Sequence, residues 1–270
     1  MGTSLPPILG NKAYEHESVF KPENMLRETR RQKKIPEGKL PRICILDPDG
    51  DILNNLLANN NAEINPYWAC YHTKLYNFKY DDIEFGIIGC AVGASFAVLI
   101  AEELFVSGCE LIISITSSGQ IVPNQKPPFF VLIDRAWRDE GTSYHYMQPS
   151  DFSYLNKEIL AVLDDAYLEL AVPVKKGATW TTDAPFRETA MAKEKAKSLG
   201  ILAVEMEASA LYAFAQACHK SVICFAHVTN MMGNIEGDFE KGEAEGSRDA
   251  LKLLSVTANK WLSTLDIRVK

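Results

Sequence analysis

The sequence predicts an α/β protein: a single domain with a central, mostly buried mixed β-sheet flanked by helices. Short β-branched apolar runs alternate along the chain with longer segments whose apolar residues recur at helical spacing. The 270 residues, 47% hydrophobic and 23% charged, have the size and composition of a globular protein with a sizeable core. Both observations exclude wholesale disorder and a small disulfide-stabilised fold.

The first half of the chain contains the strands that begin the predicted sheet. Residues 42–46 form an apolar run that ends at the turn signal Asp47-Pro48-Asp49-Gly50. The next elements are predicted as strands at 68–78 and 83–90, a helix at 95–106 that ends at Ser107-Gly108, and a strand at 111–115. Since no helix is predicted between the early strands, a mixed sheet is expected rather than a purely parallel one.

The second half alternates between the two kinds of element. Strands are predicted at 129–133, 172–178, 201–204 and 222–228, and helices at 152–170, 186–198, 208–219 and 247–265. No internal repeat or linker divides this region. We therefore expect one domain at 41–270, preceded by an N-terminal arm at 1–40.

Charge is distributed unevenly along the chain. The formal net charge is −7, which argues against nucleic-acid binding because neutralising phosphates needs clustered cations. Residues 21–42 nevertheless carry eight basic and three acidic side chains. This segment is predicted to be a solvated amphipathic helix or, alternatively, part of an arm that packs on a neighbouring subunit and brings cations to an anion there.

The remaining composition favours a cytoplasmic protein without a metal or an organic cofactor. The N-terminus lacks a basic region followed by a sustained apolar run, and the apolar stretch 90–101 is too short to span a bilayer. The six cysteines lie mostly in apolar segments without metal-ligand spacing. They are predicted to be reduced and buried.

The residues most typical of a functional site are two acids at the end of the strand predicted at 201–204. Glu205 and Glu207 stand at alternate positions, so their side chains share one side, and a helix is predicted to begin directly after them. A carboxylate there can accept hydrogen bonds from a vicinal diol. First-turn helix electrostatics would explain the same spacing.

The segment Val204-Glu-Met-Glu-Ala-Ser-Ala-Leu-Tyr212 resembles a signature of the nucleoside phosphorylase superfamily, which includes uridine phosphorylase, bacterial purine nucleoside phosphorylase and the nucleosidases. Other segments agree with the family in the same order: 88–95 with 101–104, 113–121, 138–146 and 177–186. The resemblance spans roughly residues 40 to 265. It implies a phosphorylase-like fold and cleavage of the N-glycosidic bond of a nucleoside.

The resemblance also implies site residues. Glu207 would hold the ribose 2′- and 3′-hydroxyls, Met206 would pack under the sugar and Glu205 would support them. Such carboxylates can stabilise the positive charge that develops on the ribose ring. The turn Ser117-Ser118-Gly119 would contact phosphate and ribose through exposed N–H groups. Asp183, Phe186 and Arg187 match the wall of the base pocket, and His145 is a candidate to meet the 5′-hydroxyl or a neighbouring subunit.

Two departures from the family concern the acceptor and the base. The family's phosphate-clamping arginine is missing from the loop 47–52, which has three aspartates instead, and the second phosphate arginine is replaced by Ser114. Arg135, Arg138 and the arm's Arg27, Arg30 and Arg31 are candidate replacements. Asn230 stands where the purine-specific branch has its aspartate, and an amide cannot act as a general acid.

These observations predict a nucleoside phosphorylase with phosphate as the acceptor and a uridine-type pyrimidine nucleoside as the substrate. Two alternatives stay open: a nucleosidase that uses water, and a nucleoside-binding sensor without turnover. By resemblance the chain is expected to form a homodimer or hexamer. Glu207 and Asn230 are the residues expected to act at the glycosidic bond.

Overall fold

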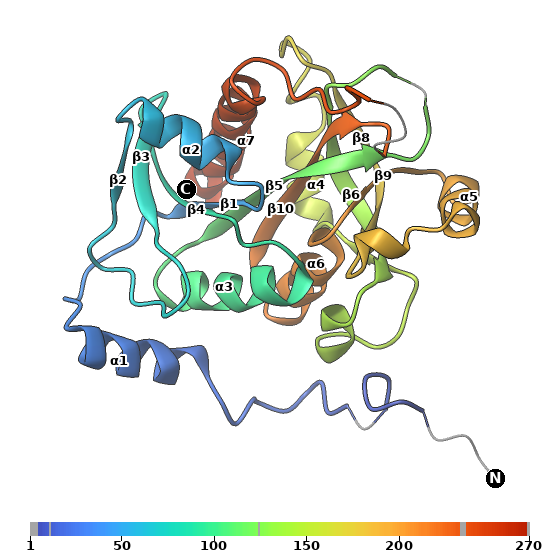
Figure 1. Ribbon diagram of the computed structural model, residues 1–270. Coiled ribbons are helices and arrows are strands. Elements are labelled where there is room, and N and C mark those ends of the chain that lie inside the picture. Colours follow the sequence, from blue (N-terminus) through green and yellow to red (C-terminus); the bar gives the residue numbers. More distant parts are fainter. Residues whose placement is uncertain (1–4, 11, 124, 233–235, 269–270) are drawn as a thin grey trace.

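A ten-stranded mixed sheet forms the centre of the computed structural model, which describes residues 5–10, 12–123, 125–232 and 236–268 (Figure 1). The strands are β1 (Ile43–Asp47), β2 (Ala62–Ile64), β3 (Tyr76–Tyr80), β4 (Ile83–Gly89), β5 (Leu111–Gln120), β6 (Phe129–Asp139), β7 (Phe152–Tyr154), β8 (Val174–Thr182), β9 (Ile201–Glu205) and β10 (Ser221–Asn230). The α/β fold with a mixed sheet is therefore confirmed.

Helices cover both faces of the sheet. They are α1 (Pro22–Lys33), α2 (Asp51–Ala58), α3 (Ala94–Val106), α4 (Lys157–Leu163), α5 (Ala190–Ser198), α6 (Ala208–Ala217) and α7 (Ser247–Arg268), with the short 3₁₀ helices η1 (Thr142–His145) and η2 (Pro185–Arg187). Figure 1 shows α3 and α6 together on one side of the sheet and α2 and α7 on the other. Helix α1 lies outside both layers.

The strand order brings the ends of several strands to one place. The order is β10-β6-β8-β9-β5-β1-β4-β3-β2, and β10 also pairs with β5, so five of the strands close a ring. Strand β1 runs parallel to β4 and β5, and β5 runs parallel to β10. Strand β9 meets β5 antiparallel through Val204 opposite Gly119. The loops that follow β1, β4, β5, β9 and β10 therefore gather at one edge.

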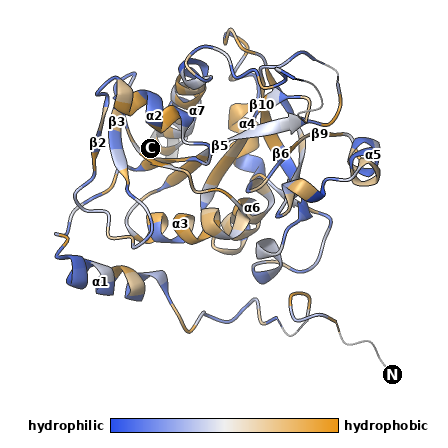
Figure 2. Ribbon diagram, viewed as in Figure 1, coloured by the Kyte–Doolittle hydropathy of each residue, from blue (hydrophilic) through white to orange (hydrophobic). Residues whose placement is uncertain are grey.

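The core explains why the apolar runs became strands. All five residues of β1 are buried, and so are most residues of β5 and β10. Figure 2 shows β10 and much of α3 as hydrophobic, whereas α1 is mostly hydrophilic. Helix α6 buries every residue from Ala208 to Phe214. The sheet and α6 are thus held from both sides, which fixes the β9–α6 junction in place.

The early part of the chain differs from its prediction by one helix. Helix α2 begins directly after the turn signal 47–50, because Gly50 adopts φ +80° and its carbonyl accepts a hydrogen bond from Asn54 N–H. Ile52, Leu53 and Leu56 are buried and have helical spacing. The strand predicted at 68–78 starts only at Tyr76.

Two predicted helices were too long. The segment 152–170 contains strand β7 and then α4, which begins where the Asn156 side chain accepts hydrogen bonds from Glu158 and Ile159 N–H groups. The segment 186–198 contains η2 and then α5, whose N-terminus is capped by the Thr189 hydroxyl. In both segments a side-chain cap sets the start of the helix, and apolar spacing did not reveal it.

Candidate functional site

The predicted ribose acid lies buried at the β9–α6 junction. Glu207 is 1% exposed, and its Oε1 accepts a hydrogen bond from Gly93 N–H at 2.7 Å. Its Oε2 lies 3.3 Å from Met206 N–H. Burial, and then the charge of Glu205, raises the pKa of Glu207, while the hydrogen bond from Gly93 opposes this. Its carboxyl group is thus held in place by the backbone of the loop before α3.

The carboxylate of Glu205 makes all of its hydrogen bonds within the protein. Its carboxylate accepts hydrogen bonds from the N–H groups of Glu207 and Ala208, both at 2.7 Å, and from the hydroxyls of Thr179 and Thr181. These partners join β8, β9 and the first turn of α6. With four donors on two oxygens, the Glu205 carboxylate is satisfied within the protein and holds the backbone at Glu207 and Ala208.

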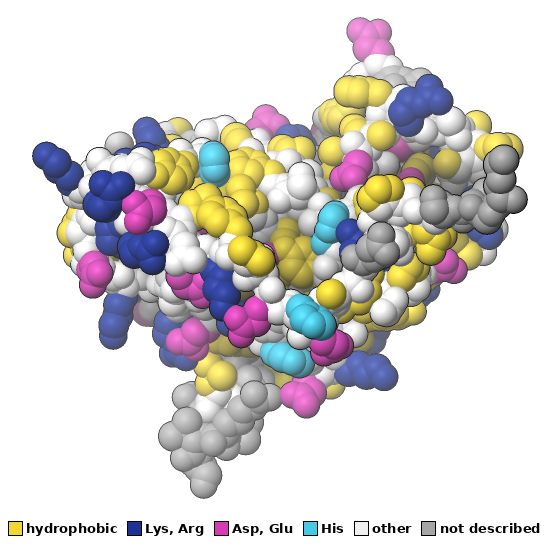
Figure 3. All heavy atoms as spheres, turned by 90° about the horizontal axis from the view of Figure 1, so that it is seen from below, with side chains coloured by type: hydrophobic (Ala, Val, Ile, Leu, Met, Phe, Trp, Pro, Cys, Tyr) yellow, Lys and Arg dark blue, Asp and Glu magenta, His cyan; other side chains and the backbone are white. Residues whose placement is uncertain are grey.

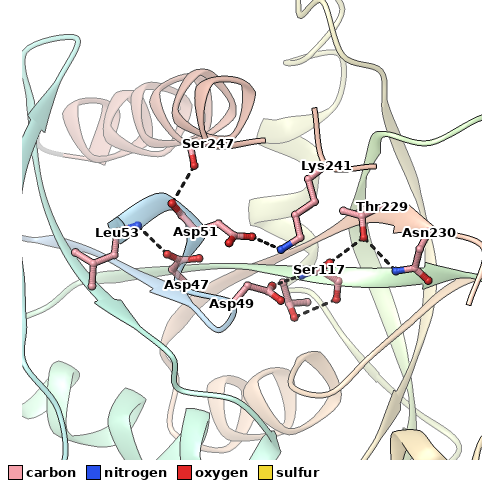
Figure 4. A network of polar contacts seen from close by, with 10 residues as sticks. Asp47, Asp49, Asp51, Leu53, Ser117, Thr229, Asn230, Lys241 and Ser247 are labelled. Carbon is pink, nitrogen blue, oxygen red and sulfur yellow. Dashed lines mark hydrogen bonds and ion pairs between the residues drawn. The ribbon is translucent and has the colours of Figure 1, made fainter. Parts of the chain in front are cut away.

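The loop after β1 reaches the turn predicted to bind an anion. Asp49 Oδ2 accepts a hydrogen bond from Ser117 N–H at 2.6 Å (Figure 4). The Ser117 hydroxyl lies 2.9 Å from the Thr229 hydroxyl on β10. Asp49 is open to solvent, but the surrounding protein partly desolvates its carboxyl group and raises its pKa. The Asp49 carboxylate therefore accepts the hydrogen bond of an N–H group that the sequence analysis predicts to contact phosphate or ribose.

The other two acids of this loop have separate roles. Asp47 is buried, accepts a hydrogen bond from Leu53 N–H at 2.9 Å, and has a pKa raised by burial to about 7. Asp51 forms an ion pair with Lys241, which comes from the segment after β10. Figure 4 shows Lys241 reaching across toward Asp51, above Asp49 and Ser117. Lys241 was not among the residues that sequence reasoning selected.

Asn230 lies at the end of β10, opposite Gly119 on β5. Its Nδ2 lies 3.1 Å from the Thr229 hydroxyl and 3.4 Å from the Ser118 carbonyl, and its Oδ1 accepts from Met232 N–H at 2.7 Å. A Cβ on Gly119 would lie 3.3 Å from Asn230 Oδ1. A larger residue at position 119 would therefore press on the Asn230 side chain, and Asn230 borders the same turn as Ser118.

The arginines that were candidates to bind phosphate make contacts away from the predicted anion site. Arg138 is buried and donates to the Ser143 and Ser150 hydroxyls and to the Gln148 carbonyl at 2.7–2.8 Å. Arg135 pairs with Asp134 beside β7 and lies over the Phe152 ring. Neither guanidinium has a described contact with the loop 47–51 or with Ser117. Arg138 instead holds the segment that follows β6.

The arm's basic residues lie on the arm's own side of the molecule. Arg30 donates to the carbonyls of Pro36 and Tyr67, and Arg27 and Arg31 both pair with Glu28. The view from below shows Lys and Arg side chains gathered, with acids among them, over the end of this face where α1 lies (Figure 3). Within one chain, none of the three has a described contact with Ser117 or Asp49.

The residues predicted for the base and the 5′-hydroxyl are spread over the next loops. Asp183 accepts a hydrogen bond from Gly141 N–H at 2.8 Å. Phe186 is fully exposed in η2, beside Arg187. His145 Nδ1 lies 3.0 Å from Lys12 Nζ of the N-terminal arm. The structure thus brings together Glu205, Met206, Glu207, Ser117, Ser118, Gly119 and Asn230, whereas Phe186, Arg187 and His145 have no described contact with this group.

Other features of the described residues lie away from this edge. A cavity of about 760 Å³ lies between α4, α6 and α7 and contains none of the predicted site residues. Over the described ranges, no group of three or more His, Cys, Asp or Glu side chains is arranged to hold a metal ion. In the same ranges, no helix combines the length and the apolar character needed to cross a membrane.

Comparisons with known proteins agree with the fold. Uridine phosphorylase from Vibrio fischeri has a similar structure, with a TM-score of 0.68 at 19% identity, over 84% of this chain and 92% of that one. A guanosine phosphorylase from Halorubrum lacusprofundi is 24% identical over 82% of this chain and 88% of its own length. Uncharacterized protein R802 of Acanthamoeba polyphaga mimivirus is 29% identical over 64% of this chain and 68% of its own.

A family model decides the assignment. The model of the phosphorylase superfamily matches residues 42–257, which include every strand of the sheet and all of the gathered site residues. The match begins where the N-terminal arm ends. This chain therefore belongs to the phosphorylase superfamily.

Proposed function

We propose that this chain cleaves the N-glycosidic bond of a nucleoside, with water as the acceptor. The observation that carries the choice of acceptor is the hydrogen bond from Ser117 N–H to the Asp49 carboxylate. A phosphate dianion at this turn would have to displace the Asp49 carboxylate or lie close to its negative charge. Each close pair of like charges costs about 1 kcal/mol even when well solvated. The sequence analysis predicts phosphate as the acceptor, whereas this contact favours water.

Glu207 is proposed to hold the ribose. Its oxygens are oriented by Gly93 N–H and Met206 N–H, so a diol that donates to them meets a preorganised acceptor. As the glycosidic bond breaks, positive charge develops on the ribose ring, and the nearby carboxylate stabilises it. Met206, half-buried beside Glu207, is proposed to contact the sugar.

Asp49 is proposed to activate the water. Its carboxylate takes one proton as the water oxygen bonds to C1′, and the bond from C1′ to the base nitrogen breaks with its electron pair on the base. A raised pKa suits this step, because a proton acceptor works best when its pKa approaches the working pH. The base then gains a proton from solvent, and free ribose is the second product.

A pyrimidine of the uridine type is the proposed substrate. Asn230 can donate a hydrogen bond to a carbonyl oxygen of the leaving base, but it has no acidic proton to give to a purine. A departing uracil anion spreads its charge over two carbonyl oxygens, so hydrogen bonds stabilise it. Asn230 would exchange its contacts with Ser118 and Thr229 for the base.

Phosphorolysis is the second candidate. It is favoured by family membership and by the activities named for the Vibrio fischeri and Halorubrum relatives. Lys241 would then be the cation nearest the turn. As in other members of the family, we propose that the chain works as a homo-oligomer, a dimer or a hexamer.

The test is product analysis on a panel of purine and pyrimidine nucleosides, with and without phosphate. The proposal expects free base and free ribose from uridine in phosphate-free buffer, and Asp49→Asn should lower this rate about 100-fold. Asp165→Asn, at an exposed site away from the loop, is the matched control. Base release that requires phosphate and yields ribose 1-phosphate would favour the second candidate. Nucleoside binding without any release would favour a sensor.

A further inference from the structure

Lys241 is held in a defined position beside the acceptor loop. The preceding residue, Glu240, donates its N–H to the Thr229 carbonyl at 2.8 Å. Further along, the Ser247 hydroxyl donates to the Asp51 carbonyl at 3.1 Å. The Lys241–Asp51 ion pair lies between these two anchors, and both side chains are only about a quarter exposed, at 22% and 25%. The backbone on either side therefore fixes where the ammonium group lies.

The ammonium group lies among acids. Asp49 interacts with Asp47 from its own loop, Asp51 from α2, Glu207 from the β9–α6 junction and Lys241 from the segment after β10. His227 of β10 interacts with Lys241 and Asp51. Burial, together with Lys241, lowers the pKa of His227 to about 4, so this ring is neutral near pH 7. Among the described residues that face Asp49, Lys241 is thus the group that carries positive charge.

The positive charge of Lys241 lowers the pKa of Asp49. Desolvation and the negative charge of Asp51 raise the pKa of Asp49, whereas the hydrogen bond from Ser117 N–H and then the charge of Lys241 lower it. Without the lysine, Asp49 would hold its proton to a higher pH. A protonated carboxyl group cannot accept a proton from water, so the ion pair controls the pH range in which Asp49 can work.

We propose that Lys241 is a positioning residue for the attack of water: it neutralises Asp51 and so keeps Asp49 in the carboxylate form, bound to Ser117 N–H. This inference rests on the proposed function, since it gives Asp49 the role of base. It assigns a task to a segment that the sequence motifs did not cover. The ion pair also offsets part of the repulsion among the three aspartates, which alternate along the short segment 47–51.

The titration of Asp49 tests the inference without relying on turnover. In protein with ¹³C-labelled aspartate carboxyl groups, Asp49→Asn identifies the Asp49 signal, and pH titrations compare the wild type with Lys241→Met. The midpoint for Asp49 should rise by about half a pH unit or more in Lys241→Met. Lys241→Arg keeps the charge and should leave the midpoint near that of the wild type. Lys176→Met, which breaks an exposed Lys–Asp pair on the far part of the sheet, is the control.

Activity provides the second measurement. In phosphate-free buffer, the acid limb of the pH profile for base release should move to higher pH in Lys241→Met and remain in place in Lys241→Arg. An unmoved Asp49 midpoint overturns the inference, whatever the enzyme does. A moved midpoint with an unmoved acid limb also overturns it, because Asp49 would then not limit the rate. A wild type that needs phosphate fails the proposed function instead, and Lys241→Met should then raise the Michaelis constant for phosphate.

Discussion

Glu205 and Glu207 are two residues apart and have opposite surroundings. Glu205 receives four hydrogen bonds from β8, β9 and α6, so its carboxylate is part of the framework. Glu207 receives two backbone contacts and borders the turn of β5. The sequence predicted the pair and the importance of Glu207 from one motif. It could not show which acid was internally satisfied, because the donors Thr179 and Thr181 lie on another strand.

Substituting the two acids by glutamine should separate these roles. Glu207→Gln keeps the shape and the oxygen that Gly93 N–H needs, so the melting temperature should stay close to that of the wild type while base release falls about 100-fold. Glu205→Gln places an amide NH₂ against two of the four donors and should lower the melting temperature by several degrees. Thermal unfolding and initial rates on both variants check this. A Glu207→Gln enzyme with normal turnover would contradict the site.

Asp47 should make stability depend on pH. Its pKa is about 7 in the folded chain against 3.8 for the unconstrained group, so the folded state binds this proton more tightly. Its contribution to stability is full below about pH 4 and is lost as the pH rises to about 7. Asp47→Asn, which can still accept from Leu53 N–H, should therefore gain stability over the wild type as the pH rises. Denaturant unfolding at pH 4.5 and 8 measures this, and a difference that does not change with pH would refute it.

At the scale of elements, hydrophobic patterning located most strands but not the points where helices begin. Helix α2 starts directly from a turn signal, and α4 and α5 start at side-chain caps. The gathered site follows from strand order, because β1, β5, β9 and β10 are far apart in sequence. Lys241 lies in a polar segment without apolar spacing, and only its ion pair with Asp51 reveals it.

Arg138 connects β6 to the segment that follows it, so its loss should be structural. Its guanidinium donates to two hydroxyls and a carbonyl in residues 143–150. Arg138→Ala leaves the buried Ser143 hydroxyl and the more exposed Gln148 and Ser150 acceptors without this donor, and should cost about 1–3 kcal/mol of unfolding free energy. Denaturant unfolding measures that loss. If stability is unchanged and only the dependence on phosphate is altered, Arg138 belongs to the acceptor site after all.

At the scale of the whole molecule, the N-terminal arm and η2 leave apolar side chains uncovered. Val19 and Phe186 are fully exposed, and Phe20 is 68% exposed. Val19 and Phe20 are adjacent in the chain, and contiguous patches of exposed apolar side chains mark surfaces that bind another molecule. We expect a second copy of the chain to cover them, which agrees with the assembly proposed above.

Sedimentation velocity tests this assembly. The wild type should sediment as a dimer or a larger homo-oligomer at micromolar concentration, and a double substitution, Val19→Ser with Phe20→Ser, should weaken the association without unfolding the chain. Leu168→Ser, at another exposed apolar side chain, is the control for general surface effects. A wild type that remains monomeric would argue against an arm shared between subunits.

The most direct measurement of the central claim is the fate of C1′ when both acceptors are present. Uridine is incubated with the enzyme and inorganic phosphate, and the reaction is followed by phosphorus NMR together with chromatography of the sugar and the base. The account predicts uracil and free ribose, no new phosphate ester, and a rate that does not change with phosphate concentration. Ribose 1-phosphate formed in step with uracil, at a rate that rises with phosphate, would contradict it.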